Sequence, residues 1–247
     1  IVTKGGLPAI GRNHGVRIAK GDFIFFLDAD VRVPVDFIEN AYNEIEERFI
    51  DIATCEFLPL SDDPIDRLLH DFVNSALKVY QFIDPHAPGC CIFTSKRLFN
   101  RINGFDETLK LAEDHDFVKR ASAFRPLRIL ESTHIEISTR RLDKEGRLRL
   151  ANKYIRVELY RLFRGEIKDD VIPYEFANFE QPRDTPWLIA NLQETKEMIQ
   201  RLNQRINLMV RHYGNTQVMT NEFKESLRDL NDQLKQMKTK LMLMFRL

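Results

Sequence analysis

Residues 23–30 have the sequence FIFFLDAD, in which five apolar residues run directly into Asp28-Ala29-Asp30. A continuous apolar run of this length is typical of a strand buried on both faces of a sheet. Short apolar strands alternate with helical patterns over the first hundred residues, which favours an α/β layer fold with a mainly parallel sheet and flanking helices. Asp28 and Asp30 then lie at the carboxyl end of a buried strand, where open α/β sheets bind ligands.

The elements on either side of this strand follow from hydrophobic period and from Pro and Gly positions. Further strands are predicted at residues 1–3, 50–57, 90–94, 127–130 and 134–138. Helices are predicted at residues 9–19, 34–48, 64–82, 95–102 and 111–124.

Asp28 and Asp30 are two carboxylates that repel each other unless a positive charge lies between them. A hard divalent cation with oxygen ligands, itself bound to a diphosphate, meets that need. Such a cation would neutralise the charge that builds on a leaving diphosphate. The alternative is structural: one Asp caps the helix that follows Pro34 and the other belongs to a turn.

Glu113 and Asp114 form a second acidic pair, at the beginning of a predicted helix. A positioned carboxylate can take the proton from an acceptor hydroxyl as that hydroxyl attacks. On a helix the two side chains point about 100° apart, so only one of them faces the site. The alternative is that both are first-turn acids that interact favourably with the helix dipole.

Two long segments resemble glycosyltransferase family 2, whose members are inverting enzymes with a GT-A, Rossmann-like fold. GRNHGVRIAKGDFIFFLDAD, residues 11–30, is similar to the stretch in which an Arg-Asn-x-Gly helix precedes the strand with the DxD motif. GCCIFTSKRLFNRINGFDETLKLAEDHDFVKR, residues 89–120, resembles the acceptor-side segment of that family. STRRLDKEGRLRL, residues 138–150, resembles a tail of many bacterial members, so the resemblance covers about residues 1–165.

The resemblance implies a role for each matching donor-side residue. Asp28 contacts the ribose or diphosphate of a nucleotide-sugar donor, and Asp30 coordinates Mn²⁺ or Mg²⁺. Arg12 and Asn13 line the donor pocket. Gly89 lets the backbone approach the donor sugar, because it has no side chain.

On the acceptor side, the resemblance makes Asp114 the general base and Glu113 a residue that helps to position the acceptor. His134 is the candidate for a third metal ligand, although its place in a predicted strand also suits a structural role. The opening strand and the acidic base-reading loop of the family are not in the chain, so we expect an N-terminal truncation and weak donor binding by this piece. The implied mechanism is a single in-line displacement that inverts the anomeric carbon.

Three functions are compatible with these motifs. The first is transfer of a sugar from a nucleotide-sugar to a glycan, lipid-linked or protein acceptor, with a role in cell-envelope polysaccharide. The second is a non-catalytic GT-A-like scaffold that oligomerises. The third is a sugar nucleotidyltransferase, whose Gly-rich phosphate loop would lie upstream of Ile1. The intact DxD and Glu-Asp pairs favour the transferase.

The C-terminal part differs in pattern, so we expect a catalytic domain at 1–168, a linker at 169–186 and a helical coiled-coil region at 187–247. Residues 140–168 hold ten Lys or Arg against four Asp or Glu and suit either peripheral contact with an anionic membrane or a helix packed on the core. Residues 188–244 have a 4-3-4-3 apolar spacing, interrupted at Gly214-Asn215. This spacing favours a homo-oligomer through an α-helical coiled coil, and the alternative is a hairpin whose seam packs within the chain.

Composition sets the remaining limits. Lys plus Arg and Asp plus Glu are equal at 37 each, so global charge gives no indication of a nucleic-acid partner. The three cysteines have neither zinc-ligand spacing nor a disulfide framework, which favours a reducing compartment. We therefore expect a cytoplasmic protein, with the inner face of the membrane as the candidate surface for peripheral contact.

Overall fold

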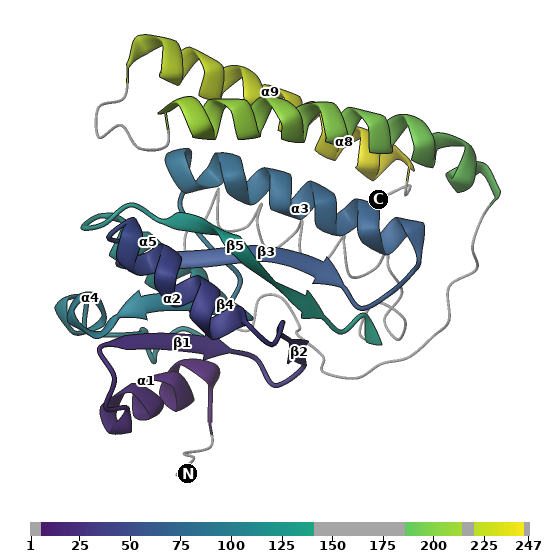
Figure 1. Cartoon of the computed structure of the whole chain (residues 1–247). Coiled ribbons are helices and arrows are strands. Elements are labelled where there is room, and N and C mark those ends of the chain that lie inside the picture. The colour runs from purple at the N-terminus through teal and green to yellow at the C-terminus, as the bar shows by residue number, and fades with distance from the viewer. Residues whose placement is uncertain (1–5, 141–185, 214–219, 245–247) are drawn as a thin grey trace.

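The computed structural model describes residues 6–140, 186–213 and 220–244, and within these ranges the chain forms a mixed α/β fold (Figure 1). Its sheet contains β1 (Phe23–Leu27), β2 (Val31–Arg32), β3 (Ile52–Pro59), β4 (Cys91–Ser95) and β5 (Arg128–Ile137). Its helices are α1 (Pro8–Ile18), α2 (Phe37–Glu47), α3 (Pro64–Ile83), α4 (Lys96–Arg101), α5 (Glu113–Ser122), α8 (Pro186–Tyr213) and α9 (Asn221–Met244).

The strand order is β1-β4-β3-β5-β2, and the directions of the strands correct the prediction of a mainly parallel sheet. Among the described strands only β3 and β5 pair in parallel, whereas β4 is antiparallel to both β1 and β3, and β2 is antiparallel to β5. An apolar run shows that a strand is buried on both faces but does not show its direction, since β4 is fully buried and still runs against its neighbours.

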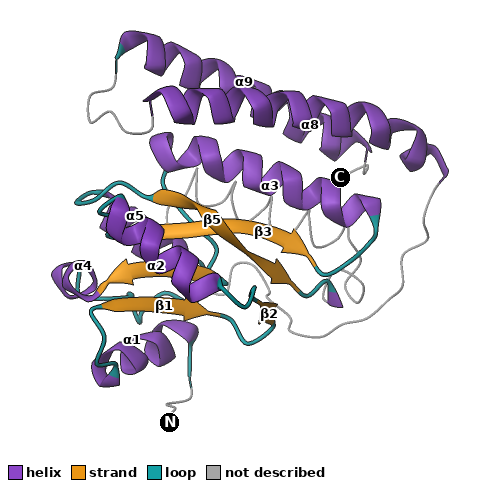
Figure 2. Cartoon of the chain, viewed as in Figure 1, coloured by secondary structure: helices purple, strands orange, loops and turns teal. Residues whose placement is uncertain are grey.

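Helices cover both faces of the sheet, as Figure 2 shows. On one face, Ile24 and Phe26 of β1 pack with Phe117 of α5 and with Val16 of α1. On the other, α2 and α3 cover an aromatic-rich cluster that includes Phe37, Phe57 and Phe93. Because β1 alternates between these two clusters, it is held from both sides, and the Asp residues that follow it are placed by a rigid strand.

The two predicted strands at 127–130 and 134–138 are a single strand, β5. Its register against β3 shifts between Cys55 and Glu56, where the ladder has an irregularity. An irregularity of this kind adds unpaired residues to one strand of a ladder. The predicted gap between the two strands, Glu131-Ser132-Thr133, corresponds to this irregularity within one continuous strand. There the backbone amides of Glu131 and Ser132 donate to the Glu44 carboxylate.

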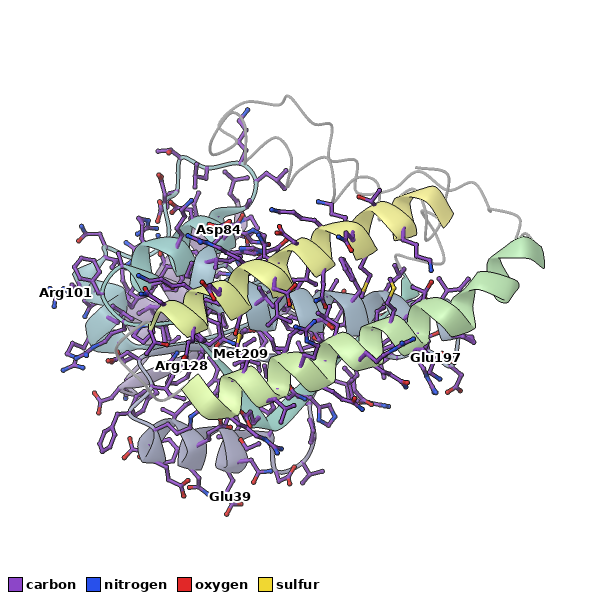
Figure 3. The ribbon with its side chains drawn as sticks, turned by 90° about the horizontal axis from the view of Figure 1, so that it is seen from above. Glu39, Asp84, Arg101, Arg128, Glu197 and Met209 are labelled. Atoms are coloured by element: carbon purple, nitrogen blue, oxygen red, sulfur yellow. The ribbon has the colours of Figure 1, made fainter. Side chains whose placement is uncertain are left out.

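The C-terminal helices α8 and α9 lie beside each other along α3, on the side away from the sheet, and run in opposite directions (Figures 1 and 3). Their described seam residues are buried together with the outward face of α3, in one cluster that includes Leu68, Ile206 and Leu230. A coiled coil between chains is therefore not confirmed, and the alternative of a hairpin packed within the chain is what the structure shows. The exposed seam on which self-association was predicted is absent at the described positions, because α3 covers it.

Polar contacts fix the position of the hairpin on α3. Ser75 donates from its hydroxyl to Asn203 Oδ1 at 2.8 Å, and Lys78 donates from Nζ to Asn207 Oδ1 at 3.1 Å. The Ser75–Asn203 pair is partly buried beside the apolar interface and disfavours a slipped register, because a slip would leave it without partners, whereas the Lys78–Asn207 pair is exposed. The interruption predicted at Gly214-Asn215, the basic stretch at 140–168 and the linker at 169–186 fall mainly or wholly outside the described residues.

No helix in the described ranges is long and apolar enough to cross a membrane.

Candidate active site

The end of β1 brings Asp28 and Asp30 to one edge of the sheet. The Asp28 amide donates to the Cys90 carbonyl at 3.3 Å, which ties the strand end to the loop before β4. The Asp30 carbonyl accepts from the Ser138 amide at 3.3 Å, just beyond β5. Asp30 is exposed at this edge, and the Asp28 side chain, which contacts Arg12, is 47% exposed.

Arg12 of α1 lies at the centre of the site and is only 16% exposed. Its Nη1 donates to Glu113 Oε1 at 2.7 Å. Its Nη2 reaches Asp28 Oδ1 at 3.4 Å and the Gly89 carbonyl at 3.3 Å. One guanidinium thus joins the end of β1, the loop before β4 and the first residue of α5, and three of the predicted residues meet around a fourth.

Asp114 faces the same loop from α5. Its Oδ2 accepts from the Gly89 amide at 2.5 Å and its Oδ1 accepts from the His115 amide at 2.8 Å. A Cβ at Gly89 would collide with Arg12 Nη2 and lie 3.0 Å from Asp114 Oδ2. Gly89 is therefore required here for a close approach of backbone to side chains, with Arg12 and Asp114 as the groups that approach it.

Burial raises the pKa of three carboxyl groups in this cluster. For Asp114 and Glu113 the largest cause is desolvation, and for Glu113 the neighbouring Asp114 charge adds to it. Desolvation is also the largest cause of the raised pKa of Asp28, ahead of the opposing effect of Arg12, and the charges of Asp30 and Asp114 raise it further. Carboxyl groups with raised pKa values that gather at one edge of a sheet are typical of a functional site.

The donor set of this cluster suits a hard divalent cation. Asp28, Glu113 and Asp114 lie near Arg12, and the charge of Asp30 adds to that of Asp28, so negative charge is in excess. Carboxylate oxygens are the ligands that Mg²⁺ and Mn²⁺ prefer. Among the described residues no three His, Cys, Asp or Glu side chains are placed to hold a metal by themselves. The Asp28 and Asp30 edge therefore fits a cation that takes its other ligands from a bound diphosphate.

His134 is not brought to this edge by the structure. It lies inside β5 opposite Glu56 of β3, and its charge acts on Glu136 of its own strand. The part of β5 that neighbours the Asp30 segment is Ile137, which pairs with Val31. The prediction of His134 as a metal ligand has no support in this geometry, because a strand carries it away from Asp30.

Asn13, predicted as a donor-pocket residue, has its side chain bonded to the turn that precedes α5. Its Nδ2 donates to the Phe105 carbonyl and to Glu107 Oε1, both at 2.9 Å, and its Oδ1 accepts from the Phe105 amide at 2.9 Å. Both donors of the side chain are thereby used by the turn that precedes α5.

Two residues near the site were given no role from the sequence. The Phe105 ring lies under the Arg12 guanidinium, 5.3 Å from its centroid, within the Gly-Phe-Asp-Glu turn that the resemblance identified. Ala112 precedes α5 with φ of 59°, a left-handed conformation that is uncommon without glycine. Strain of this kind often accompanies functional sites, but an alanine gives no signal of it in a sequence.

The fold and the site define an α/β protein with a carboxylate-lined ligand edge at the end of a buried strand. Residues 3–102 match the family model of Glycosyl transferase family 2. Residues 3–102 are therefore similar to glycosyltransferase family 2, as the resemblance predicted for this part of the chain.

The chain also matches solved structures at low sequence identity, and it spans less than two thirds of the length of the TarS 1-349 chains. A crystal structure of S. aureus TarS 1-349 has 16% identity and a TM-score of 0.43, and the match covers 96% of this chain and 62% of that one. TarS 1-349 in complex with UDP-GlcNAc gives the same identity and TM-score over 96% and 63%. Mannosyltransferase PcManGT from Pyrobaculum calidifontis, in complex with GDP-Man and Mn²⁺, has 15% identity and a TM-score of 0.48 over 96% and 67%. No curated protein sequence matches the chain.

Proposed function

We propose that the chain is the catalytic part of a metal-dependent, inverting glycosyltransferase that moves a sugar from a nucleotide-sugar to an acceptor hydroxyl. The observation that supports this most directly is the bridge formed by Arg12 and Gly89. It brings the strand that ends in Asp28 and the helix that begins with Glu113 and Asp114 into one cluster. A donor site and a base must lie this close for one displacement to use both.

Each residue has a task in this proposal. Asp28 and Asp30 hold the diphosphate side of the donor, and a bound Mn²⁺ or Mg²⁺ supplies Lewis-acid stabilisation of the leaving diphosphate. Asp114 accepts the proton of the attacking hydroxyl. Its raised pKa increases its affinity for that proton, which suits a general base. Gly89 and the His115 amide hold both oxygens of Asp114, so the carboxylate is fixed before the acceptor arrives.

Inversion follows in this proposal from attack on the face opposite the leaving group. Glu113 is fixed by Arg12 and orients the acceptor beside Asp114. The acceptor class remains a glycan, a lipid-linked sugar or a protein hydroxyl, and contact of residues 140–168 with an anionic membrane belongs to the lipid-linked version. The alternative of a non-catalytic scaffold relied on an exposed heptad seam for oligomer formation. It is less well supported, because the described seam residues are buried against α3.

The test is nucleotide release by the chain, produced together with any sequence that its gene encodes before Ile1. UDP-, GDP- and dTDP-sugars are screened with Mn²⁺ or Mg²⁺, and product stereochemistry is read by NMR. We expect release with one donor class, loss on removal of the metal, and loss in Asp30→Ala and Asp114→Ala variants that remain folded. Metal-independent release, or no release from a folded protein with any donor and acceptor extract, would contradict the proposal.

A further inference from the structure

The Asn13 side chain is directed into the turn of residues 104–107, and this turn carries the beginning of α5. We propose that Asn13 is a positioning residue that fixes this turn and, through it, places the base Asp114. The inference rests on the proposed function for its kinetic consequences. Its structural content, that one amide on α1 holds the first turn of α5 in place, stands separately and is tested separately.

The hydrogen bonds of Asn13 determine its orientation and use up its donors. Its Oδ1 must face the Phe105 amide, because an N–H can only donate, and its Nδ2 must face the Phe105 carbonyl. The second Nδ2 hydrogen is taken by Glu107 Oε1 at 2.9 Å. A donor sugar or phosphate could receive a hydrogen bond from Asn13 only after one of these bonds is broken.

The turn is shaped to this amide. Gly104 has φ of 69°, and a Cβ on it would lie 2.6 Å from Asn13 Oδ1. A side chain at Gly104 would therefore be strained by its backbone and would also push Asn13 away. The absence of a side chain at Gly104 thus leaves the space that the Asn13 side chain occupies against the backbone of the turn.

Two contacts connect the turn of residues 104–107 to α5. The Phe105 ring stacks on Phe117 with centroids 4.1 Å apart and an interplanar angle of 16°. Arg120 donates to the carbonyls of Ile102 and Gly104 at 2.8 and 2.9 Å, and it is held on α5 by Asp116 at 2.7 Å. Phe117 lies one turn after Asp114, so a displaced turn would move the part of the helix that presents the base.

Arg12 and Asn13 therefore act on α5 from adjacent positions of α1. Arg12 binds Glu113 directly and lies over the Phe105 ring, whereas Asn13 holds the Phe105 backbone beneath it. The donor side of the site, Asp28 and Asp30, follows β1, whose backbone is paired with β4 along its length and whose Phe26 ring meets the Phe105 ring edge to face at 5.0 Å. Loss of Asn13 should thus impair the chemical step more than donor binding.

The kinetic test uses Asn13→Asp, which keeps the size of the side chain but puts a carboxylate oxygen opposite the Phe105 carbonyl and Glu107. We expect kcat to fall about 10- to 100-fold, as for a small displacement of a catalytic group, while donor KM changes less than about threefold. Adding Glu107→Gln should recover part of the loss, since a Gln amide can donate to Asp at position 13. Arg17→Gln is the matched control, because Arg17 also contacts the Glu107 carboxylate, at 3.9 Å, but is exposed and makes no contact with the Phe105 backbone that Asn13 holds.

The structural test is amide hydrogen exchange of Asn13→Ala without donor or metal. We expect faster exchange in residues 104–107 and 113–117, with residues 23–27 of β1 unchanged, and a Tm measurement shows that the variant is folded. Unchanged exchange in 104–117, or a donor KM that rises while kcat is kept, would overturn the inference. If exchange changes as expected but the wild-type protein transfers no sugar, the proposed function fails and the positioning of α5 by Asn13 stands.

Discussion

The candidate active site and the α8–α9 hairpin are held together by opposite means. Around Arg12, several carboxyl groups share one guanidinium, and burial raises the pKa of Asp28, Glu113 and Asp114. Between the hairpin and α3, a long apolar seam is closed and polar pairs such as Ser75 and Asn203 only fix its register. The hairpin therefore contributes stability, whereas the candidate site holds unfavourable charge that the fold around it must stabilise.

The largest difference between the two regions should appear on removing the base. Asp114→Ala is expected to lower the rate of transfer by about 10²- to 10⁴-fold, the range for a general base, with little loss of donor affinity. Single-turnover kinetics at saturating donor measure it. Because Asp114 is the proposed general base and burial raises its pKa, wild-type activity should fall with decreasing pH at a value above the ordinary aspartate range. An unaltered rate in the variant would remove Asp114 from the mechanism.

A cavity in the hairpin should affect stability and leave the chemistry intact. Ile206 on α8 is fully buried, and Ile206→Ala is expected to lower the free energy of unfolding by about 2–5 kcal/mol. Leu208 on the same helix is 67% exposed, so Leu208→Ala should change it by less than about 0.5 kcal/mol. Urea unfolding of both variants measures the difference. Equal and small effects would show that α8 does not pack on α3 in solution.

A methyl group at Gly89 should affect the site and spare the fold. In Gly89→Ala the new Cβ displaces Arg12 and crowds Asp114, so we expect a rate loss of about 10- to 100-fold. Gly15→Ala on α1 is the matched control, because its Cβ would meet no atom within 4 Å and alanine in a helix gains about 0.5–1 kcal/mol. Steady-state kinetics and Tm for both variants separate these effects. A fully active Gly89→Ala variant would show that Arg12 and Asp114 need not approach this backbone.

The two regions also differ in how much of them the sequence predicts. Helical period places α3, α8 and α9 well, because 3.6-residue spacing is a property of one helix. Helical period does not show what an apolar face packs against, and the apolar spacing from residue 188 onward is compatible with packing on a second chain as well as on α3. The partner depends on α3 having apolar residues on its outward side, such as Leu68 and Phe72, in addition to those that face the sheet.

At the site, motif order predicted that Asp28, Gly89, Glu113 and Asp114 would gather, and the structure brings them together around Arg12. It could not show that the Asn13 amide is used by backbone groups, because a hydrogen-bonding side chain has the same sequence signal whether it binds a ligand or a turn. The direction of β4 was missed for a similar reason, since burial of a strand carries no information on its direction. The two-residue strand β2 was not predicted at all.

The smallest expected effect concerns charge at Asp28. Its pKa is raised in the folded protein, so folding favours the protonated form, and the cost is absent below the ordinary value of 3.8 and present once pH exceeds the raised value. Asp28→Asn should therefore be slightly more stable than the wild type at pH 7, by less than about 1 kcal/mol because the side chain is half-exposed, and the gap should close as pH falls toward 4. Thermal unfolding at several pH values measures it. Added Mn²⁺ should reverse the order of stability, because the cation stabilises the Asp28 and Asp30 edge of the wild type more than that of the variant. If the difference in stability depends on neither pH nor Mn²⁺, this edge has no excess of negative charge for a metal to neutralise.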